Sequence, residues 1–598
     1  MGIHLGDNRF VRALRLSQRA FGDYRKQIMA LTAFGFLSGI LEGIGVNALI
    51  PLFSFALNGG GQGTDFISRT IEKFFNFFGL NLSVSYLLVF IVILFILKAI
   101  VVLYLNVLKA KITSDYEAKT QSNLLKHVLA SRWEYLLRQK LGHLENIINT
   151  DVKQSGVLLQ QISNAIMVAT SLLVYTIVAI NISFVFTLAT LAVGGVIFFV
   201  FKKHLFITKR IGHDRTSTNK MIAHYINENV VGIKTVKTMG VTKPILDKAN
   251  LFFNKLKELS IEETWRKTIT TAFIQPIGVI FICFIFAITY TSSTFNLAVL
   301  VAIVYLIQRI FTYLQQLQRG MQSAMTLIPH LQSVVDYQQI ASEQKENVDQ
   351  AKPFIFKKSI VFDHVTFSYR QDTPVLKGIS FKVNKGEMIG IVGPSGAGKT
   401  TLVDLLLRLF QLDQGRILLD GVDANDIDLV QWRSKIGYVS QDMFLMNDTI
   451  ANNIRFYNQA LSQKEIEAAA KQAQIHDFVQ TLPEKYDSII GDRGVLLSGG
   501  QRQRVVIARV LAQKPDVLVL DEATSALDNE SEVKIQEVIR NLRGKVTVLV
   551  IAHRLSTIMD SDQLLILTDG KVSEQGLPKT LLKDKESYFS KVYNIRNN

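Results

Sequence analysis

Long, nearly unbroken apolar runs fill the first part of the chain, and a different pattern follows. A transmembrane helix needs about 20 mostly apolar residues. Six runs meet this requirement, at 28–57, 83–110, 157–181, 184–202, 269–292 and 297–318. Very short links at Asn181–Ser183 and Ser293–Asn296 join two pairs of runs, which predicts two tight hairpins. After the last run, short apolar strand patterns alternate with helical ones, as in a soluble α/β domain.

The two long segments between spans, 111–156 and 203–267, keep apolar residues at helical spacing. We therefore expect the membrane helices to continue beyond the bilayer. At 1.5 Å per residue, an extension of about 17–20 residues reaches roughly 25–30 Å. Gly142 and Gly232 are the expected breaks at which these helices turn.

Basic residues indicate the orientation, because cytoplasmic loops of membrane proteins carry an excess of Lys and Arg. Residues 202–267 hold fourteen Lys and Arg, whereas the segment 58–74 holds only Arg69 and Lys73. With six spans, both long loops and the C-terminal part then lie in the cytoplasm. The basic, partly apolar stretch 9–26 fits an amphipathic helix on the membrane surface.

A polar stretch at 341–354 ends the periodic pattern and marks a domain boundary. We predict a multidomain membrane protein. It has an α-helical transmembrane domain of six helices at 1–340, a linker at 341–358 and an α/β domain at 359–598.

Composition agrees with a membrane protein. Of the 598 residues, 48% are hydrophobic and 19% are charged, whereas soluble domains average roughly 25% charged residues. The single cysteine, Cys283, excludes an intrachain disulfide and a multi-cysteine zinc site. Because it lies in an apolar run, we expect a buried, unreactive thiol. Cytoplasmic loops account for much of the net charge of +16, so we expect no nucleic-acid partner.

The soluble part carries a phosphate-binding pattern. The apolar strand EMIGIV leads into GPSGAGKT, and a helical pattern follows. This is the P-loop pattern in its strand–loop–helix setting. Glycines let backbone N–H groups approach phosphate, and the helix N-terminus adds a positive dipole end. Lys399 can reach the β and γ phosphates, and Thr400 can ligate magnesium. The predicted cradle consists of Gly393, Pro394, Ser395, Gly396, Ala397, Gly398, Lys399, Thr400 and Thr401.

A second strand, VLVL, ends in the acids Asp521 and Glu522. Four apolar residues are typical of a buried parallel strand. Asp521 at the strand end would orient a magnesium ion, and Glu522 is placed to polarise the attacking water as a general base. An apolar strand that ends in two acids is common, so this assignment depends on the P-loop.

A third motif, LSGGQ, precedes a long helical pattern. Ser498, Gly499 and Gly500 place a small hydroxyl and two glycines before the helix, which makes a second anion-binding cap. The simpler alternative is an ordinary N-capped helix. Because the chain already has one phosphate cradle, the second one suggests a γ-phosphate contact from a partner.

With these motifs in this order, the chain resembles the ATP-binding cassette (ABC) family over nearly its whole length. LSGGQ, which ends in Gln501, stands between GPSGAGKT and VLVLDE and is highly specific. The resemblance implies that ATP and Mg²⁺ are the cofactors. It also implies roles for Tyr369 in stacking on adenine, for Gln441 as the Q-loop glutamine that contacts magnesium and water, and for His553 as the switch histidine. The segment GDRG is similar to the exporter X-loop, but Asp492 stands where Glu is common.

Six spans followed by one cassette resemble a type IV ABC exporter half-transporter. That resemblance implies a dimer, with each ATP between the P-loop of one subunit and LSGGQ of the other. It also implies coupling helices near 131–142 and 227–240. We expect a homodimer in the bacterial inner membrane, with the cassettes in the cytoplasm. A heterodimer with a degenerate partner stays open.

Three ionisable residues lie inside predicted spans, where charge is costly and marks functional sites. They are Glu42, Lys98 and Arg309. We hypothesise that Arg309 faces a cavity and binds an anionic headgroup, with Tyr305 and Tyr313 on the same helix face. The alternative is a structural ion pair, most naturally between Glu42 and Lys98.

The first span, GILEGIGVNALIPLF, is similar to bacterial flippases of lipids and lipid-linked oligosaccharides. We therefore expect ATP-driven export or flipping of an amphipathic substrate by alternating access between two states. A multidrug or peptide exporter and an ATP-gated channel or regulator of the ABC class are the alternatives. A soluble nucleic-acid ATPase disagrees with the six spans.

Overall fold

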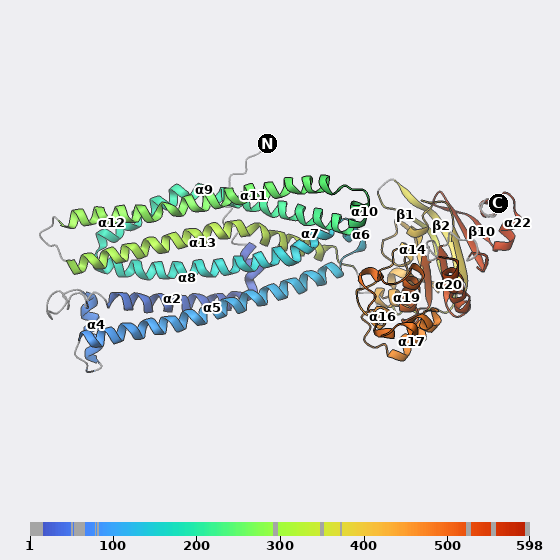
Figure 1. The fold of residues 1–598 in the computed structure, drawn as a ribbon, viewed down its shortest axis with the longest axis horizontal. Coiled ribbons are helices and arrows are strands. Elements are labelled where there is room, and N and C mark those ends of the chain that lie inside the picture. Colours follow the sequence, from blue (N-terminus) through green and yellow to red (C-terminus); the bar gives the residue numbers. More distant parts are fainter. Residues whose placement is uncertain are drawn as a thin grey trace. The chain divides into compact units, whose positions relative to one another are not determined.

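The computed structural model describes residues 16–48, 52, 66–77, 79, 83–290, 297–346, 352–370, 373–521, 528–551 and 558–591. The chain divides into two compact units. The first unit consists of Met1–Ser131 and Tyr135–Lys345, and the second of Arg132–Glu134 and Glu346–Asn598. Within the described residues, long helices make up the first unit and both β-sheets belong to the second (Figure 1).

The long helices of the first unit lie lengthwise beside one another (Figure 1). They are α2 (Arg25–Asn47), α5 (Val84–Leu129), α8 (Val152–Ile182), α9 (Phe184–Val231), α11 (Thr242–Ala272), α12 (Ile274–Tyr290) and α13 (Leu297–Glu343). Shorter elements connect or flank them: η1 (Gly22–Tyr24), α4 (Phe66–Phe77), α6 (Trp133–Leu137), α7 (Leu141–Asn146), the π-helical η2 (Ile147–Asp151) and α10 (Ile233–Thr238).

As far as the described residues reach, five of the six predicted spans each fall on a single helix, whereas the fifth, 269–292, is divided between α11 and α12 at Phe273. The end of the first span and the link Ser293–Asn296 lie outside them. By length and apolarity, four segments of the described chain can cross a membrane, and the apolar helix Phe184–Val200 is slightly shorter. A single residue, Ser183, separates α8 from α9, which confirms the first tight hairpin.

Two helices confirm the predicted continuation beyond the bilayer. Helix α5 has 46 residues and α9 has 48, so each is roughly 70 Å long. Helix α9 ends at Gly232, which is its C-cap, as the sequence predicted. The short helices α6 and α10 fall inside the two ranges expected for coupling helices.

Two predictions for single residues were wrong. The chain turns at 138–140, before Gly142, which lies in the first turn of α7. A Cβ on Gly142 would lie 2.9 Å from the carbonyl oxygen of Ala223, so this glycine permits close packing against α9. The thiol of Cys283 is exposed on α12 rather than buried. An apolar run in a membrane helix does not imply burial in protein, because lipid can cover it.

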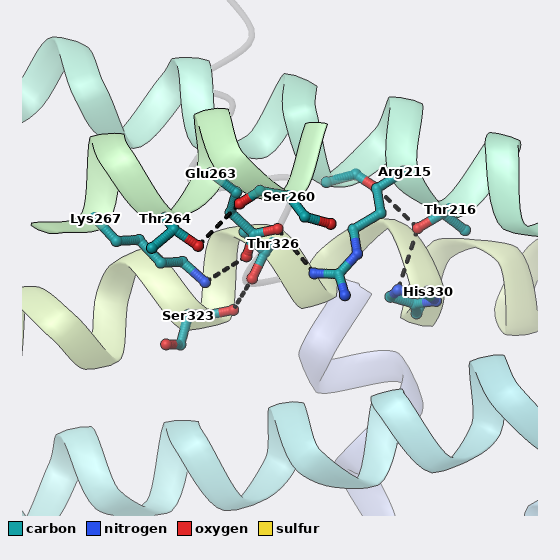
Figure 2. Close-up of polar contacts among 10 residues, drawn as sticks. Arg215, Thr216, Ser260, Glu263, Thr264, Lys267, Ser323, Thr326 and His330 are labelled. Carbon is teal, nitrogen blue, oxygen red and sulfur yellow. Dashed lines mark hydrogen bonds and ion pairs between the residues drawn. The ribbon is translucent and has the colours of Figure 1, made fainter. Parts of the chain in front are cut away.

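Helices α9 and α13 approach closely where a glycine leaves room. A Cβ on Gly212 would lie 2.8 Å from the carbonyl oxygen of Thr326 and 2.9 Å from its Cα. One turn further along α9, the hydroxyl of Thr216 lies 3.2 Å from Nε2 of His330 on α13 (Figure 2). The lack of a side chain at Gly212 therefore permits the short distance between these two helices.

A buried carboxylate ties α9 to α11. Glu263 is 6% exposed. Its oxygens lie 2.9 Å from Nη1 of Arg215 on α9 and 2.5 Å from Nζ of Lys267 on α11 (Figure 2). A buried charge needs such partners, so this triad fixes the two helices against each other.

Within the described residues, the second unit holds two sheets. The antiparallel sheet has the order β2-β1-β4-β5 and contains β1 (Ser359–Ser368), β2 (Pro374–Asn384), β4 (Gln414–Leu419) and β5 (Val422–Asp423). The other has the order β10-β9-β3-β8-β7-β6 and contains β3 (Met388–Val392), β6 (Ile436–Val439), β7 (Val517–Asp521), β8 (Thr547–Ile551), β9 (Gln563–Thr568) and β10 (Lys571–Gly576). It is parallel except at β10.

Helices accompany these sheets along the chain. They are α14 (Lys399–Leu406), η3 (Ala424–Asp426), α15 (Leu429–Lys435), α16 (Ile450–Arg455), α17 (Gln463–Gln472), α18 (His476–Thr481), η4 (Lys485–Asp487), η5 (Asp492–Gly494), α19 (Gly499–Ala512), α20 (Asn529–Leu542) and α22 (Pro578–Lys583).

Replacing Gly212 tests the close packing of α9 on α13. We expect Gly212→Ala to lower the thermal unfolding midpoint of the detergent-solubilised protein by several degrees, because the methyl group would meet backbone that cannot move aside. Overpacking of this kind costs about 1–3 kcal/mol. Gly195→Ala on the same helix is the control, since a Cβ there meets nothing within 4 Å. An equal midpoint for both variants would contradict the packing.

Candidate functional site

The P-loop joins strand β3 to helix α14. A Cβ on Gly393 would lie 2.1 Å from the carbonyl oxygen of Leu567, so only glycine fits there. Gly398 has a φ of 98° and forms the N-cap of α14 in the left-handed region that favours glycine. Lys399 donates 3.0 Å hydrogen bonds to the carbonyl oxygens of Gly393 and Pro394. These bonds hold the ammonium group against the loop.

Asp521 lies at the same edge of the sheet as the P-loop. Strands β3 and β7 flank β8, and both Ile391 and Asp521 pair with Ile551 of β8. Because these strands are parallel, the segments that follow them leave from one edge. Asp521 is 4% exposed, and the hydroxyl of Tyr438 on β6 donates to its carboxylate at 3.3 Å.

An acid that the sequence analysis missed, Asp404, belongs to this site. It lies on α14, one helical turn after Thr401. Burial raises the pKa of Asp404 to about 6, and the nearby carboxylate of Asp521 adds to the rise. The signal in the sequence was an isolated acid within the apolar pattern TLVDLLLRLF.

The residues predicted to hold adenine and the metal lie close by in the fold. The hydroxyl of Tyr369 lies 3.1 Å from Oγ1 of Thr401, and 45% of Tyr369 remains exposed. Thr400 is exposed in the first turn of α14. Gln441 is exposed two residues after the end of β6, at the edge from which the P-loop and the segment after β7 also leave.

The LSGGQ segment begins helix α19. Ser498 is its N-cap: its hydroxyl accepts from the backbone N–H of Gln501 at 3.3 Å, and its own backbone N–H donates to the Gln501 side chain at 2.8 Å. This is the N-capped helix that the sequence offered as the simpler alternative. Gly500 has a second reason to be glycine, because a Cβ there would lie 2.1 Å from Oγ of Ser531 on α20.

Two residues predicted to act in hydrolysis, Glu522 and His553, lie outside the described residues. Asp528 is the first described residue after Glu522. Its carboxylate accepts from the backbone N–H of Ser531 at 3.2 Å and so caps α20.

A charged cluster occupies the membrane part of the first unit. Glu42 on α2 is 4% exposed. Its carboxylate lies 3.1 Å from Nζ of Lys98 on α5 and 3.6 Å from Nη2 of Arg309 on α13. Tyr313 donates to the same carboxylate at 2.8 Å, and Nε of Arg309 donates to the hydroxyl of Tyr305 at 2.7 Å. The ion pair that the sequence suggested is present, and Arg309 joins it.

Comparisons with known proteins agree with this architecture. The family profile described as ABC transporter matches residues 376–525, and the profile described as ABC transporter transmembrane region matches residues 28–318. An ATP-dependent lipid A-core flippase of Saccharophagus degradans is 32% identical over 487 residues, which cover 80% of this chain and 78% of that protein. The chain belongs to the ABC transporter family.

Two further similarities cover most of this ABC transporter. The ATP-dependent lipid A-core flippase of Legionella pneumophila is 32% identical over 80% of this chain and 81% of its own length. A bacterial Atm1-family ABC exporter solved with ATP bound matches with a TM-score of 0.80 and 25% identity, over 96% of this chain and 99% of that one. The chain is therefore an integral membrane protein and an ATP-hydrolysing transporter.

Removing the Asp404 carboxyl should change how the stability of the transporter depends on pH. Because folding raises the pKa of Asp404 from 3.8 to about 6, the native state holds a proton that the unfolded chain releases, and stability falls as pH rises through this window. The free energy of unfolding of Asp404→Asn, relative to that of the wild type, should therefore increase by about 1–2 kcal/mol as the pH rises from 4.5 to 7.5. Thermal unfolding at both pH values measures this. Asp413→Asn, which removes an exposed carboxylate, should show no such gain, and a pH-independent Asp404→Asn effect would refute the prediction.

The charged cluster around Glu42, which also contains Lys98, Arg309, Tyr305 and Tyr313, has one carboxylate. Removing that carboxylate should lower the stability of the transporter. Glu42→Gln leaves Lys98 and Arg309 without a counter-charge in the membrane, which should cost roughly 2–4 kcal/mol in detergent-solubilised protein. The double change Glu42→Gln/Lys98→Gln should recover part of the loss, because one unpaired cation is removed. Glu258→Gln, at an exposed position on α11, is the control for thermal unfolding. No recovery in the double variant would show that the charges are independent.

Proposed function

We propose that this ABC transporter flips an amphipathic lipid or a lipid-linked oligosaccharide across the membrane. The observation that carries the proposal is its similarity, over 80% of its length, to proteins named ATP-dependent lipid A-core flippase. A match of that extent includes the membrane helices as well as the cassette. Multidrug or peptide export and ATP gating of a channel are the competing functions.

We assign the nucleotide to the edge formed by the P-loop and Asp521. The backbone N–H groups of the cradle Gly393–Thr401 would bind the phosphates, and Tyr369 would stack on adenine. Oxygen donors suit magnesium, and Thr400, Gln441 and Asp521 supply them at one sheet edge. Magnesium, when bound, neutralises charge on the phosphate oxygens.

Hydrolysis is assigned to three polar residues. Glu522 would act as general base on the attacking water, Gln441 would orient that water, and His553 would contact the γ-phosphate. Their order around the P-loop supports these roles, as does the position of Glu522 directly after Asp521.

A dimer of two half-transporters follows from the arrangement of motifs. Ser498, Gly499, Gly500 and Gln501 would complete the site of a partner subunit at the start of α19, where a helix dipole favours anions. One chain carries every motif, so a homodimer would contain two complete sites. ATP binding would favour the closed dimer, and hydrolysis would reset it.

We place the protein in the bacterial inner membrane with its cassette in the cytoplasm, on the basis of the Lys and Arg excess in 202–267. We keep the predicted domain division as part of the proposal: a transmembrane domain at 1–340, a linker at 341–358 and a cassette at 359–598. Helix α13 reaches Glu343, so the first residues of that linker are helical.

Inside the membrane, the Glu42 cluster would lie on the path of the substrate. Two cations share one carboxylate, so one positive charge remains for an anionic headgroup. The side chains of Lys98 and Arg309 are 24% and 36% exposed, whereas that of Glu42 is 5% exposed. Tyr305 and Tyr313 orient these groups through the hydrogen bonds described above.

Flipping can be tested in proteoliposomes that contain labelled lipid A-core glycolipid. ATP should drive the glycolipid to the other leaflet. Glu522→Gln should lower both ATP hydrolysis and flipping by at least about 100-fold, because the general base is lost, while ATP binding persists. Glu537→Gln, at an exposed position on α20, is the control. Normal turnover by Glu522→Gln would refute the assignment of the base. ATP-driven movement of drugs or peptides without glycolipid flipping would refute the substrate class.

A further inference from the structure

A cavity of about 940 Å³, whose lining combines apolar and basic side chains, lies within the first unit and does not involve the Glu42 cluster. Helix α9 lines one side of it with Arg210, His213, Ser217 and Lys220. Their spacing of three, seven and ten residues from Arg210 places them on one face of the helix. Helix α13 forms another side, and α6, α7 and η2 contribute further lining residues.

Basic side chains outnumber acidic ones in the lining of this cavity. Lys209, Arg210 and Lys220 line it, and Asp336 is the one acid among its described lining residues. Because Lys220 is paired with the buried Asp151, Arg210 is the cation on which ligand binding depends. Arg210 is exposed and has no ion pair within the described part of the chain. Cations that converge on a concave site attract anions, and guanidinium groups bind phosphate and carboxylate in two-pronged geometry.

The floor of the cavity is rigid. Lys220 forms a hydrogen bond with Ser333 and an ion pair at 3.3 Å with Asp151, which is fully buried. His330 holds the other oxygen of Asp151 at 2.8 Å. These contacts join η2, α9 and α13, so the Lys220 ammonium is positioned before any ligand binds.

The cavity lies beyond the predicted end of the fourth span and is partly apolar. The fourth predicted span ends at 202, so Lys209 is about 10 Å and Lys220 about 27 Å further along α9. Ile328, Tyr337 and Ile340 of α13 supply apolar wall. The phosphate of a simple phospholipid stays at the headgroup level, whereas the sugars of a glycolipid extend into water. A site at this depth therefore suits sugars that carry phosphate or carboxylate groups.

We propose that this cavity binds the anionic sugar portion of the transported glycolipid before flipping, while the acyl chains remain in the bilayer. The inference rests on the proposed function and names the part of the substrate that is recognised. A free sugar phosphate has the same chemistry, so the experiment must separate the two sources.

The test measures binding to the full-length protein in nanodiscs of neutral phosphatidylcholine. Three probes are titrated: lipid A-core glycolipid, the same glycolipid after removal of its phosphates, and its free phosphorylated oligosaccharide. The wild type should bind the intact glycolipid most tightly. Arg210→Gln should weaken that binding about 10-fold, as expected for a lost charge-assisted hydrogen bond, and Arg210→Lys should recover part of it. Ser217→Trp should weaken binding by filling the cavity. Lys255→Gln removes an exposed charge on α11 and should bind as the wild type does.

The outcomes separate the two proposals. If the wild type neither binds nor flips the glycolipid, the proposed function fails and the inference fails with it. If it binds and flips the glycolipid but Arg210→Gln and Ser217→Trp bind equally well, the cavity assignment alone is overturned. Binding of the free oligosaccharide as tightly as the glycolipid would overturn the lipid as the source, and indifference to phosphate removal would overturn the charge-based recognition.

Discussion

In the described part of the first unit, each buried carboxylate contacts two basic side chains. The arrangement of the helices depends on these contacts. An unpaired charge in an apolar medium is too costly to persist. Three such triads occur: Glu42 with Lys98 and Arg309, Glu263 with Arg215 and Lys267, and Asp151 with Lys220 and His330. Between them they connect α2, α5, α9, α11, η2 and α13.

The Glu42 triad matters within the predicted spans because lipid tails are as apolar as leucine, so apolar burial does little to choose which membrane helices pack together. Polar contacts make that choice. Beyond the predicted end of the fourth span, Gly212 and Thr216 lie one turn apart on α9, and they bring the helix against Thr326 and His330 of α13. Close backbone approach and a polar contact therefore act at the same crossing.

The spans and the phosphate cradle could be read from the sequence because both signals are local. A run of apolar residues or a glycine-rich loop after a strand needs no knowledge of distant neighbours. Contacts between helices were less accessible. The pairing of Glu42 with Lys98 was offered as the alternative to a role in substrate binding, and the third member, Arg309, was assigned to the substrate. Gly500 was read as an anion-binding residue, although Ser531, which the fold brings beside it, also requires a glycine there.

The unbroken course of α5 and α9 has a mechanical consequence. Each runs for roughly 70 Å, and a stiff rod of that length works as a lever arm. A tilt of a few degrees displaces its far end by several times the shift near the pivot. The single-residue link at Ser183 leaves little slack for the end of α9 to absorb such a swing, so the motion must pass to the helices packed against it.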